Sequence, residues 1–431
     1  MAVLFVVLLL LEAFWLVHSP YFGLLLFVAV PAAFALGLLL IPVGFRLEAR
    51  RRRRSPGPPP PDWPVFDLGI PRQRRIIVLF VVATIVNLVL LSMASYGAVH
   101  YMESVQFCGQ VCHTTMEPQF AAHQRGAHAR IPCVSCHVGS GVGAAVESKM
   151  AGSRQLWQLA TDRVPKPVPS PVHSMRPARD TCEQCHWPEK FHGDEVRTIR
   201  EYADDGKNSE TVTPLTIYVG GGSAKLGAGT GIHWHMNLDN EIEYVTTDAR
   251  RETIPYVRLR DRSGTVREYV VDGLTPETLA AGERRRMDCM DCHNRPAHTF
   301  DFTPERAVDN ALAQGRVPRE LPFVRREVLA AVTVDYPDRR AALDTIASRL
   351  RAYYSGPRAA DSQLVERAVA GAQDVWAGNV FPAMKVKWGT YTNHIGHVDT
   401  PGCFRCHDDE HKAKDGRVIR QDCTLCHSEV E

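Results

Sequence analysis

The chain contains twelve cysteines in six close pairs, and a histidine directly follows the second cysteine of every pair. Five pairs have the spacing C-x-x-C-H, in which the two thiols bond to the vinyl groups of a haem and the histidine on the same short turn reaches the iron. These sites are Cys133, Cys136 and His137; Cys182, Cys185 and His186; Cys289, Cys292 and His293; Cys403, Cys406 and His407; and Cys423, Cys426 and His427. A zinc knuckle, a redox dithiol or a disulfide framework also uses paired cysteines, but none of them requires a histidine after every pair. The sequence therefore predicts covalently attached haem c at these five sites.

The pair nearest the N-terminus differs because three residues, not two, separate its cysteines. Cys108, Cys112 and His113 form this C-x-x-x-C-H site. The attachment loop must bulge to take the additional residue, and Gly109 is the residue that would permit the bulge. A free or disulfide-bonded pair is the alternative. With this site the sequence predicts six haems c, so that much of the core would be porphyrin rather than side chain.

Three apolar spans lie near the N-terminus, at residues 2–17, 21–43 and 76–99. At about 1.5 Å per residue the second and third are long enough to cross a bilayer, and the first is marginal. A signal peptide is the alternative for the first span, but no basic region precedes it and no small-residue cleavage site follows it. A hydrophobic residue directly after Met1 leaves open a natural start further upstream. We expect a transmembrane helical hairpin at 1–45 and a transmembrane anchor at 76–99.

Basic residues cluster between the second and third spans, in an Arg- and Pro-rich loop at 46–75 that includes five consecutive arginines at 50–54. The positive-inside rule makes this loop cytoplasmic. Residues from about 101 onward then lie on the outer face, where bacteria attach haem c. The segment 55–61, with four consecutive prolines, is typical of a polyproline spacer. The predicted location is the inner membrane, crossed several times, with the haem domain in the periplasm.

The chain beyond the anchor divides into three regions. Residues 100–200 carry the first three motifs. Residues 201–285 contain alternating, β-branched segments at 215–219, 242–246, 256–259 and 266–271, which predict a small β insertion. Residues 286–431 carry the last three motifs, and 304–377 shows apolar residues at helical spacing. The predicted fold is a membrane-anchored multihaem cytochrome c, with N-terminal transmembrane α-helices plus a mainly α, haem-packed periplasmic domain with a small β insertion. The net charge of +2 gives no reason to expect a nucleic-acid partner.

Histidines outside the motifs are numerous enough to supply distal iron ligands. Each one alone could equally be a surface histidine, but together they favour bis-histidine coordination of most haems. The candidates are His128, His173, His192, His298, His394, His397 and His411. Two histidine ligands leave no open position on iron, which suits electron transfer, and they keep the reduction potential low.

Two further ligand candidates have open interpretations. Met116 lies three residues after His113, so it either ligates the first iron or packs against porphyrin. His233 and His235 flank Trp234, and as alternate residues of a strand they would share a face that binds iron or another metal. The stretch 142–161 is open as well, because it either lies on the membrane with Trp157 at the headgroups or packs on haem as a soluble helix.

The apolar anchor leading into 101–107, followed by Cys108, Cys112 and His113, then His128 and the motif at 133–137, resembles the NapC/NirT family of membrane-anchored multihaem cytochromes c. The resemblance covers residues 76 to about 195, and the C-terminal half looks like larger relatives with extra haems. The resemblance implies oxidation of menaquinol or ubiquinol at the membrane surface. It also implies transfer of the electrons to a periplasmic redox partner protein or an outer-surface acceptor.

Family members use a Lys and an acidic residue after the second motif to contact the quinol. Lys149 matches the Lys, which makes it the candidate catalytic residue, whereas Gln155 stands about where the acid is expected. The chain departs from the family pattern in its three spans and in the C-x-x-x-C-H spacing of its first motif.

Two other classes of function are alternatives. A periplasmic multihaem terminal reductase would need one iron with an open coordination position beside a cluster of polar side chains. A structural or sensory protein would use haem only to hold its fold.

Overall fold

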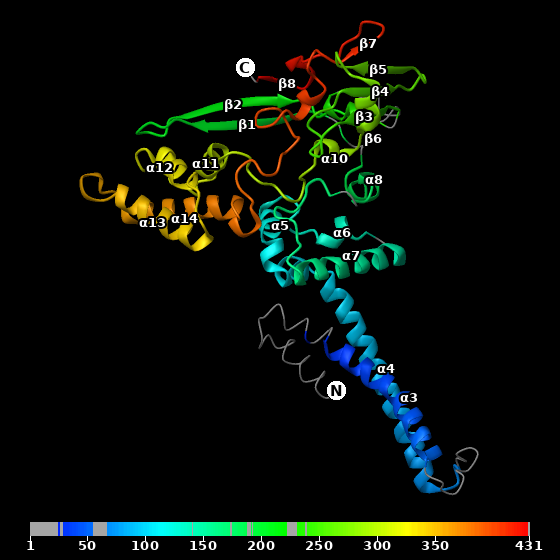
Figure 1. Cartoon of the computed structure of the whole chain (residues 1–431). Helices are drawn as coiled ribbons and strands as arrows, with labels where there is room; N and C mark the ends of the chain where they lie inside the picture. The colour runs from blue at the N-terminus through cyan, green and yellow to red at the C-terminus, as the bar shows by residue number, and fades with distance from the viewer. Residues whose placement is uncertain are drawn as a thin grey trace. The chain divides into compact units, whose positions relative to one another are not determined.

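The computed structural model describes residues 25, 29–54, 67–139, 141–172, 175–187, 191, 193–221, 231–237 and 239–429. The chain divides into two units, residues 1–113 and 114–431 (Figure 1). The predicted first span at 2–17 and the polyproline spacer at 55–61 lie outside the described residues.

Two long helices make up most of the first unit: α3 (Val30–Arg54) and α4 (Pro71–Met102). α4 covers the predicted anchor at 76–99, and among the described residues it is the one helix long and apolar enough to cross a membrane. Pro71 stands in its first turn, where a missing N–H costs no hydrogen bond. Large apolar side chains such as Leu79 and Phe80 are exposed along α4. Exposed apolar surface of this kind suits a helix surrounded by lipid.

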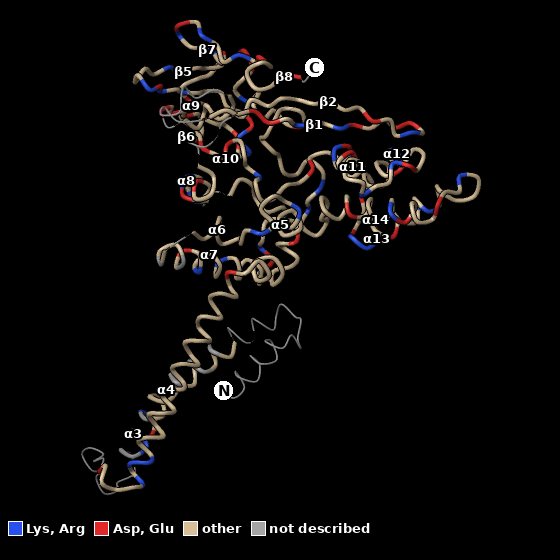
Figure 2. The backbone as a smooth tube through the Cα atoms, turned by 180° about the vertical axis from the view of Figure 1, so that it is seen from behind, with Lys and Arg blue, Asp and Glu red and all other residues tan. Residues whose placement is uncertain are grey.

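α3 differs from the prediction at its C-terminal end. The second span was expected to end at residue 43 and to be followed by a loop from 46, but α3 continues through the basic run to Arg54 (Figure 2). Arg, Leu, Glu and Ala are among the strongest helix formers, so the helix persists after its apolar part ends. Most of the predicted span before Val30 lies outside the described residues.

The first cysteine pair begins on a π-helix, η2 (Phe107–Val111), with Cys112 as its C-terminal cap. A π-helix is closed by i→i+5 hydrogen bonds and so takes more residues per turn than an α-helix. The wide turn therefore accommodates the third spacer residue of the C-x-x-x-C motif. Gly109 is buried within it and is not among the residues of the described chain that have positive φ. The expected bulge is made by the wide turn and not by a left-handed glycine.

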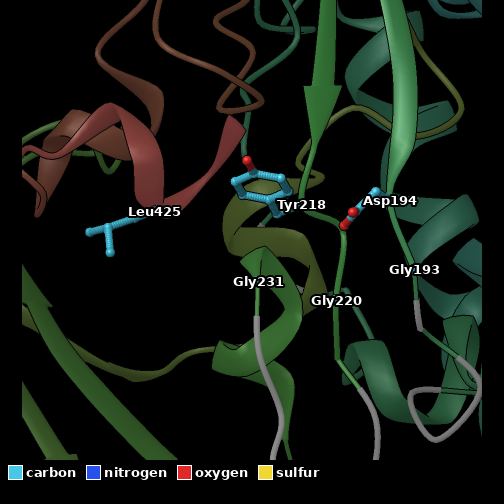
Figure 3. Close-up of a pocket in the computed structure, with 6 residues that line it drawn as sticks. All are labelled: Gly193, Asp194, Tyr218, Gly220, Gly231 and Leu425. Atoms are coloured by element: carbon cyan, nitrogen blue, oxygen red, sulfur yellow. The ribbon is translucent and has the colours of Figure 1, made fainter. Parts of the chain in front are cut away.

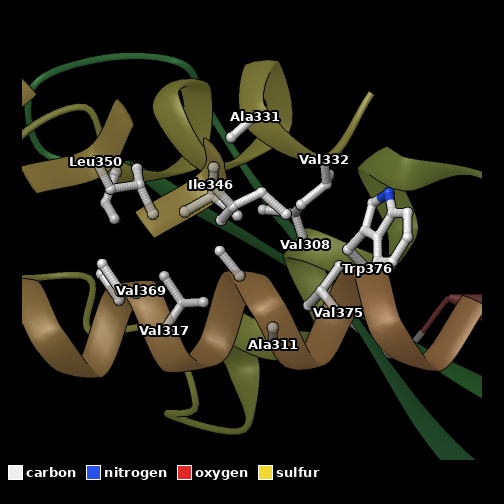
Figure 4. Close-up of a cluster of buried hydrophobic side chains, with 14 of the residues drawn as sticks. Val308, Ala311, Val317, Ala331, Val332, Ile346, Leu350, Val369, Val375 and Trp376 are labelled. Carbon is white, nitrogen blue, oxygen red and sulfur yellow. The ribbon is translucent and has the colours of Figure 1, made fainter. Parts of the chain in front are cut away.

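Four helices of the second unit pack around one apolar core (Figure 4). They are α11 (Pro304–Ala313), α12 (Val324–Val332), α13 (Arg339–Tyr353) and α14 (Ser362–Asn379), which confirms the helical pattern at 304–377. Thr303, Asp338 and Asp361 cap three of them by accepting backbone N–H groups. Ile346 and Trp376 are almost fully buried. Among the described residues, no cysteine or histidine belongs to this core, so these helices pack on side chains alone.

Two antiparallel sheets make up the β structure, in the orders β1-β2-β8 and β6-β3-β4-β5-β7 (Figure 1). The strands are β1 (Glu195–Tyr202), β2 (Glu210–Ile217), β3 (Glu241–Thr246), β4 (Tyr256–Arg260), β5 (Val266–Val270), β6 (Glu283–Arg286), β7 (Lys412–Ala413) and β8 (His427–Glu429). The strand predictions at 242–246, 256–259 and 266–271 are confirmed as β3, β4 and β5. The sheets also take in the C-terminal tail, because β7 and β8 pair with β5 and β2. Since β8 begins at His427, strand pairing positions the last motif.

The remaining helical elements carry the haem motifs or connect them. They are α5 (His113–Arg125), α6 (Cys133–His137), α7 (Val142–Ala160), α8 (Ala178–Cys182), η4 (Ile232–Met236), α9 (Pro276–Ala281), α10 (Cys289–Cys292), η5 (Gly356–Arg358), η6 (Pro382–Met384), η7 (Gly402–Arg405) and η8 (Cys423–Leu425). The strand expected for His233 and His235 is wrong, because both lie on the 3₁₀ turn η4.

Candidate haem sites

Each C-x-x-C-H motif begins in a short helix (α6, α8, α10, η7 or η8), although His427 of the last motif already belongs to strand β8. The His186 N–H donates to the carbonyl of Cys182, and the His293 N–H to that of Cys289, each at 2.8 Å. This is the i to i−4 bond of an α-helical turn. None of the twelve cysteines, all of which are described, forms a disulfide. The local geometry fits thioether attachment of haem c rather than a disulfide framework.

The motif histidine of each C-x-x-C-H site faces a second histidine from another part of the chain. The ring centres are separated by 6.1 Å for His137 and His298, 6.1 Å for His186 and His128, 6.2 Å for His293 and His233, 5.9 Å for His407 and His235, and 6.1 Å for His427 and His397. Two metal–nitrogen bonds of about 2.0 Å, with about 1.1 Å from each nitrogen to its ring centre, place two such rings about 6 Å apart. All five pairs therefore have the spacing of two imidazoles on one iron.

Backbone carbonyls fix the orientation of most of these second histidines. The Nδ1 atom of His128 lies 3.0 Å from the carbonyl of Pro296, that of His298 lies 3.0 Å from the carbonyl of Gln119, and that of His233 lies 3.1 Å from the carbonyl of Val219. A donor bond from Nδ1 leaves Nε2 as the metal-binding atom. Burial also lowers the pKa of His298, to about 4, so its ring is neutral and able to bind iron.

The other predicted distal ligands have different positions. His173 and His192 lie outside the described residues. His411 is buried, and both of its ring nitrogens are engaged, Nδ1 by Asp408 at 2.8 Å and Nε2 by the carbonyl of Ile254 at 2.7 Å. His394 is also buried and lies 3.3 Å from the carbonyl of Asp291 through Nδ1. Neither residue faces the ring of a motif histidine in the described chain.

His233 and His235 each face a motif histidine. From the sequence, they could bind either iron or another metal. In a 3₁₀ helix of three residues per turn, residues i and i+2 point to different sides. His233 accordingly faces His293 of the fourth motif, whereas His235 faces His407 of the fifth. The His-Trp-His pattern was visible in the sequence. Because it was assigned to a strand, the two histidines were expected on one face and not beside two different motifs.

The attachment sites of the second, third and fourth motifs are neighbours in space, in the same order as in the sequence. α8, which ends at Cys182, packs against both α6 and α10. The thiols of Cys182 and Cys289 are hydrogen-bonded, and this contact raises the pKa of Cys182. Burial raises the pKa of Cys136, and the nearby thiols of Cys133 and Cys185 add to the rise. The second, third and fourth motifs thus form a continuous row.

The fifth and sixth motifs extend this row. Burial raises the pKa of Cys292 to about 12, with a further contribution from nearby Cys403. Burial also raises the pKa of Cys426, and the nearby thiol of Cys403 adds to this rise. The ring of Phe404, between the fifth pair of cysteines, stacks on His397 at 4.3 Å between ring centres. Five motifs are therefore adjacent in the order in which they occur in the sequence.

A cavity lies beside the last motif and connects it with η4. It is lined by Gly193, Asp194, Tyr218, Gly220, Gly231 and Leu425 (Figure 3). The N–H of Tyr218 donates to the carbonyl of Cys426, and the carbonyl of Tyr218 accepts the N–H of Ile232, each at 2.8 Å. Gly231 has a φ of 69°, and a Cβ there would lie 2.5 Å from the Tyr218 carbonyl. Only glycine can therefore begin η4 in this position.

The first motif belongs to the first unit. Cys108 lies on η2, and burial raises the pKa of the Cys112 thiol. His113 begins α5, and Met116 follows on the same helix. Both interpretations of Met116, as a ligand and as packing against porphyrin, stay open.

The predicted quinol residue Lys149 lies on α7 of the second unit and is exposed. The same helix exposes the apolar side chains of Val146, Met150, Leu156 and Trp157, the last at 65%. An exposed apolar face suits both interpretations of the 142–161 stretch, because either lipid or porphyrin would cover it. Gln155, at the position of the expected acid, is exposed too.

Comparison with known proteins identifies the family of this chain. The family model for the N-terminal region of the NapC/NirT cytochrome c family matches residues 71–168. The cytochrome c-type protein ImcH of Geobacter sulfurreducens is 39% identical over 420 residues, which cover 96% of this chain and 82% of the relative. No solved structure gives a significant match. The chain thus belongs to the NapC/NirT family of c-type cytochromes, membrane-anchored electron-transfer proteins with covalently bound haem c.

Proposed function

We propose that this protein oxidises a quinol at the membrane and passes the electrons through six haems c to a periplasmic or outer-surface acceptor. The observation that carries the proposal is the set of five facing histidine pairs. An iron held by two imidazoles has no open position, so it carries electrons and does not bind a substrate. The five pairs therefore leave the first site as the one place where a terminal reductase could have its open iron.

From these pairs we propose the distal ligands. His298 serves the second site, His128 the third, His233 the fourth, His235 the fifth and His397 the sixth. Haem c supplies reversible one-electron chemistry at each site. The role of the histidines is to hold each iron six-coordinate, while the backbone carbonyls behind them keep the rings aligned. His411 has a structural role, because Asp408 and the Ile254 carbonyl occupy its nitrogens.

The contacts between motifs support a single unbranched path through the second unit. Successive attachment sites touch through α6, α8 and α10, and η4 then contributes one ligand to the fourth site and one to the fifth. The stacking of Phe404 on His397 joins the fifth site to the sixth. Adjacent sites allow one electron at a time to move along the row. The first site, directly after the anchor in the sequence, would accept electrons from the quinol.

The quinol end of the path rests on the family resemblance and on α7. A menaquinol or ubiquinol must lose two protons as well as two electrons, so its oxygen atoms need polar partners at the membrane surface. The Lys149 ammonium would donate a hydrogen bond to one of them, while the apolar face of α7 lies against lipid. Because Gln155 is not a base, a different group would accept the proton. We further propose a multi-pass protein of the inner membrane with the haems in the periplasm, since the basic residues of 46–75 favour a cytoplasmic loop.

The test compares Lys149→Ala with Arg154→Ala, which removes an exposed cation from the same helix. Haem reduction by a quinol analogue should slow at least tenfold in Lys149→Ala and stay near the wild-type rate in Arg154→Ala. Dithionite needs no binding site, so it should reduce all haems in both variants. The haem content should equal that of the wild type, because neither residue is a ligand. A wild-type rate with the quinol analogue in Lys149→Ala would exclude this residue from the quinol site.

A further inference from the structure

The segment 293–298 serves three different haem sites. His293 belongs to the fourth motif, and His298 faces His137 of the second. Between them, the carbonyl of Pro296 holds His128, the distal histidine of the third site, at 3.0 Å. Arg295 lies in the middle of this junction and is only 9% exposed. Its charge therefore lies close to several of the sites that carry electrons.

Arg295 is a buried cation without an acidic partner in the described part of the chain. Its Nε has no hydrogen-bond partner, and its guanidinium lies over the ring of Tyr391 at 3.9 Å and over that of Phe300 at 5.6 Å. The other two described arginines buried to this degree have polar partners: Arg251 lies 3.8 Å from Asp291, and Arg405 donates to three backbone carbonyls. A buried charge without a counter-ion is strongly destabilising. The site therefore calls for an anion that none of the described residues provides.

The aromatic residues place Arg295 on the side of the segment that faces the second site. Tyr391 hydrogen-bonds the side chain of Gln119, and the carbonyl of Gln119 accepts the bond from His298. Arg295, Tyr391, Gln119 and His298 are thus one connected group. Because an arginine binds a carboxylate through two parallel N–H bonds, a carboxylate is the anion that this guanidinium fits best.

We propose that Arg295 binds a propionate carboxylate of the haem held by His137 and His298. This inference rests on the haem assignment proposed above. A haem carries two propionates, which are anionic at neutral pH. One propionate next to Arg295 would neutralise the buried guanidinium, and the guanidinium would neutralise the propionate. The ion pair anchors this haem and offsets the negative charge of the propionate near the iron. Because negative charge favours the ferric state, the pair keeps the potential of this haem higher than it would otherwise be.

The experiment is a spectropotentiometric titration of the complete membrane protein with all haems attached. Arg295→Met keeps the length of the side chain and removes the charge. One of the six one-electron steps should move to a more negative potential, with about a tenfold change in the oxidised-to-reduced ratio, equivalent to about 59 mV. Arg340→Met is the matched control, because Arg340 is 93% exposed on α13, and all six of its steps should match the wild type. Unchanged potentials in an Arg295→Met protein that contains all its haems would overturn the proposal.

A second variant covers the case in which Arg295→Met does not fold. Arg295→Lys keeps the charge but loses the bidentate donor, so the resonance Raman band of propionate bending should shift for one haem, with no shift in Arg340→Met. An unshifted band in Arg295→Lys would also overturn the proposal. The haem assignment fails separately, because its five histidine pairs require at least five low-spin haems in the wild-type protein before any variant is made.

Discussion

Replacing His298 with alanine should change one iron in six from low-spin to high-spin. His298 faces His137 at 6.1 Å, and its Nδ1 is held by the carbonyl of Gln119, so Nε2 is the atom that reaches the iron. The matched control is His123→Ala. His123 is 3% exposed and its ring centre lies 6.1 Å from that of His298. Its Nε2 contacts the carbonyl of Ile131 at 3.0 Å and its Nδ1 the side-chain amide of Gln124 at 3.2 Å, so neither nitrogen is available to iron.

The structure separates the spectroscopic effect from the effect on stability. His298→Ala leaves the half-buried carbonyl of Gln119 without its donor, which costs about 1–3 kcal/mol, toward the lower end because the site is only half buried. His123→Ala loses two hydrogen bonds from a more buried ring, so it should destabilise the protein by at least as much. Only His298→Ala should also add a high-spin signal equal to about one sixth of the haem in electron paramagnetic resonance and absorbance spectra. A spin state unchanged from the wild type in His298→Ala, or an additional high-spin iron in His123→Ala, would refute the ligand assignment.

Two further predictions concern the whole chain. The six cysteine pairs predict six covalent haems in the mature protein; a mass corresponding to five would exclude the Cys108 site, and four or fewer would contradict the assignment as a whole. A topology reporter inserted in the 55–61 loop should be active only in the cytoplasm, and one fused after Glu431 only in the periplasm, whereas the reverse pattern would invert the topology.

The local parts of the sites could be predicted from the sequence because they depend on short stretches of chain. A C-x-x-C-H motif specifies its own helical turn, and the helices at 304–377 follow from apolar spacing and from caps such as Thr303 and Asp338. The first motif shows how far this local argument extends. Its third spacer residue indicated a bulge, but the choice of a π turn over a left-handed glycine depends on the backbone of the whole 107–111 segment.

The distal ligands could not be assigned in the same way, because they depend on contacts between distant segments. His397 lies six residues before Cys403 of the fifth motif, and His411 lies four residues after His407 of the same motif. In the structure His397 faces His427, whereas His411 is taken up by Asp408 and by the carbonyl of Ile254. No local pattern distinguishes the two residues. The deciding partner, Ile254, comes from the segment that leads into β4, far from the motif that it affects.

The turn η4 shows how backbone geometry links separate sites. Its three residues per turn direct His233 and His235 to different sides, so in the assignment proposed above a single turn holds ligands for two irons. Gly231 fixes the start of the turn by its positive φ, and the carbonyl of Val219 fixes the ring of His233. Any displacement of this turn must therefore move both ligands together. Since a strand would have placed both rings on one face, the 3₁₀ conformation is what allows the fourth and fifth sites to be consecutive steps of one path.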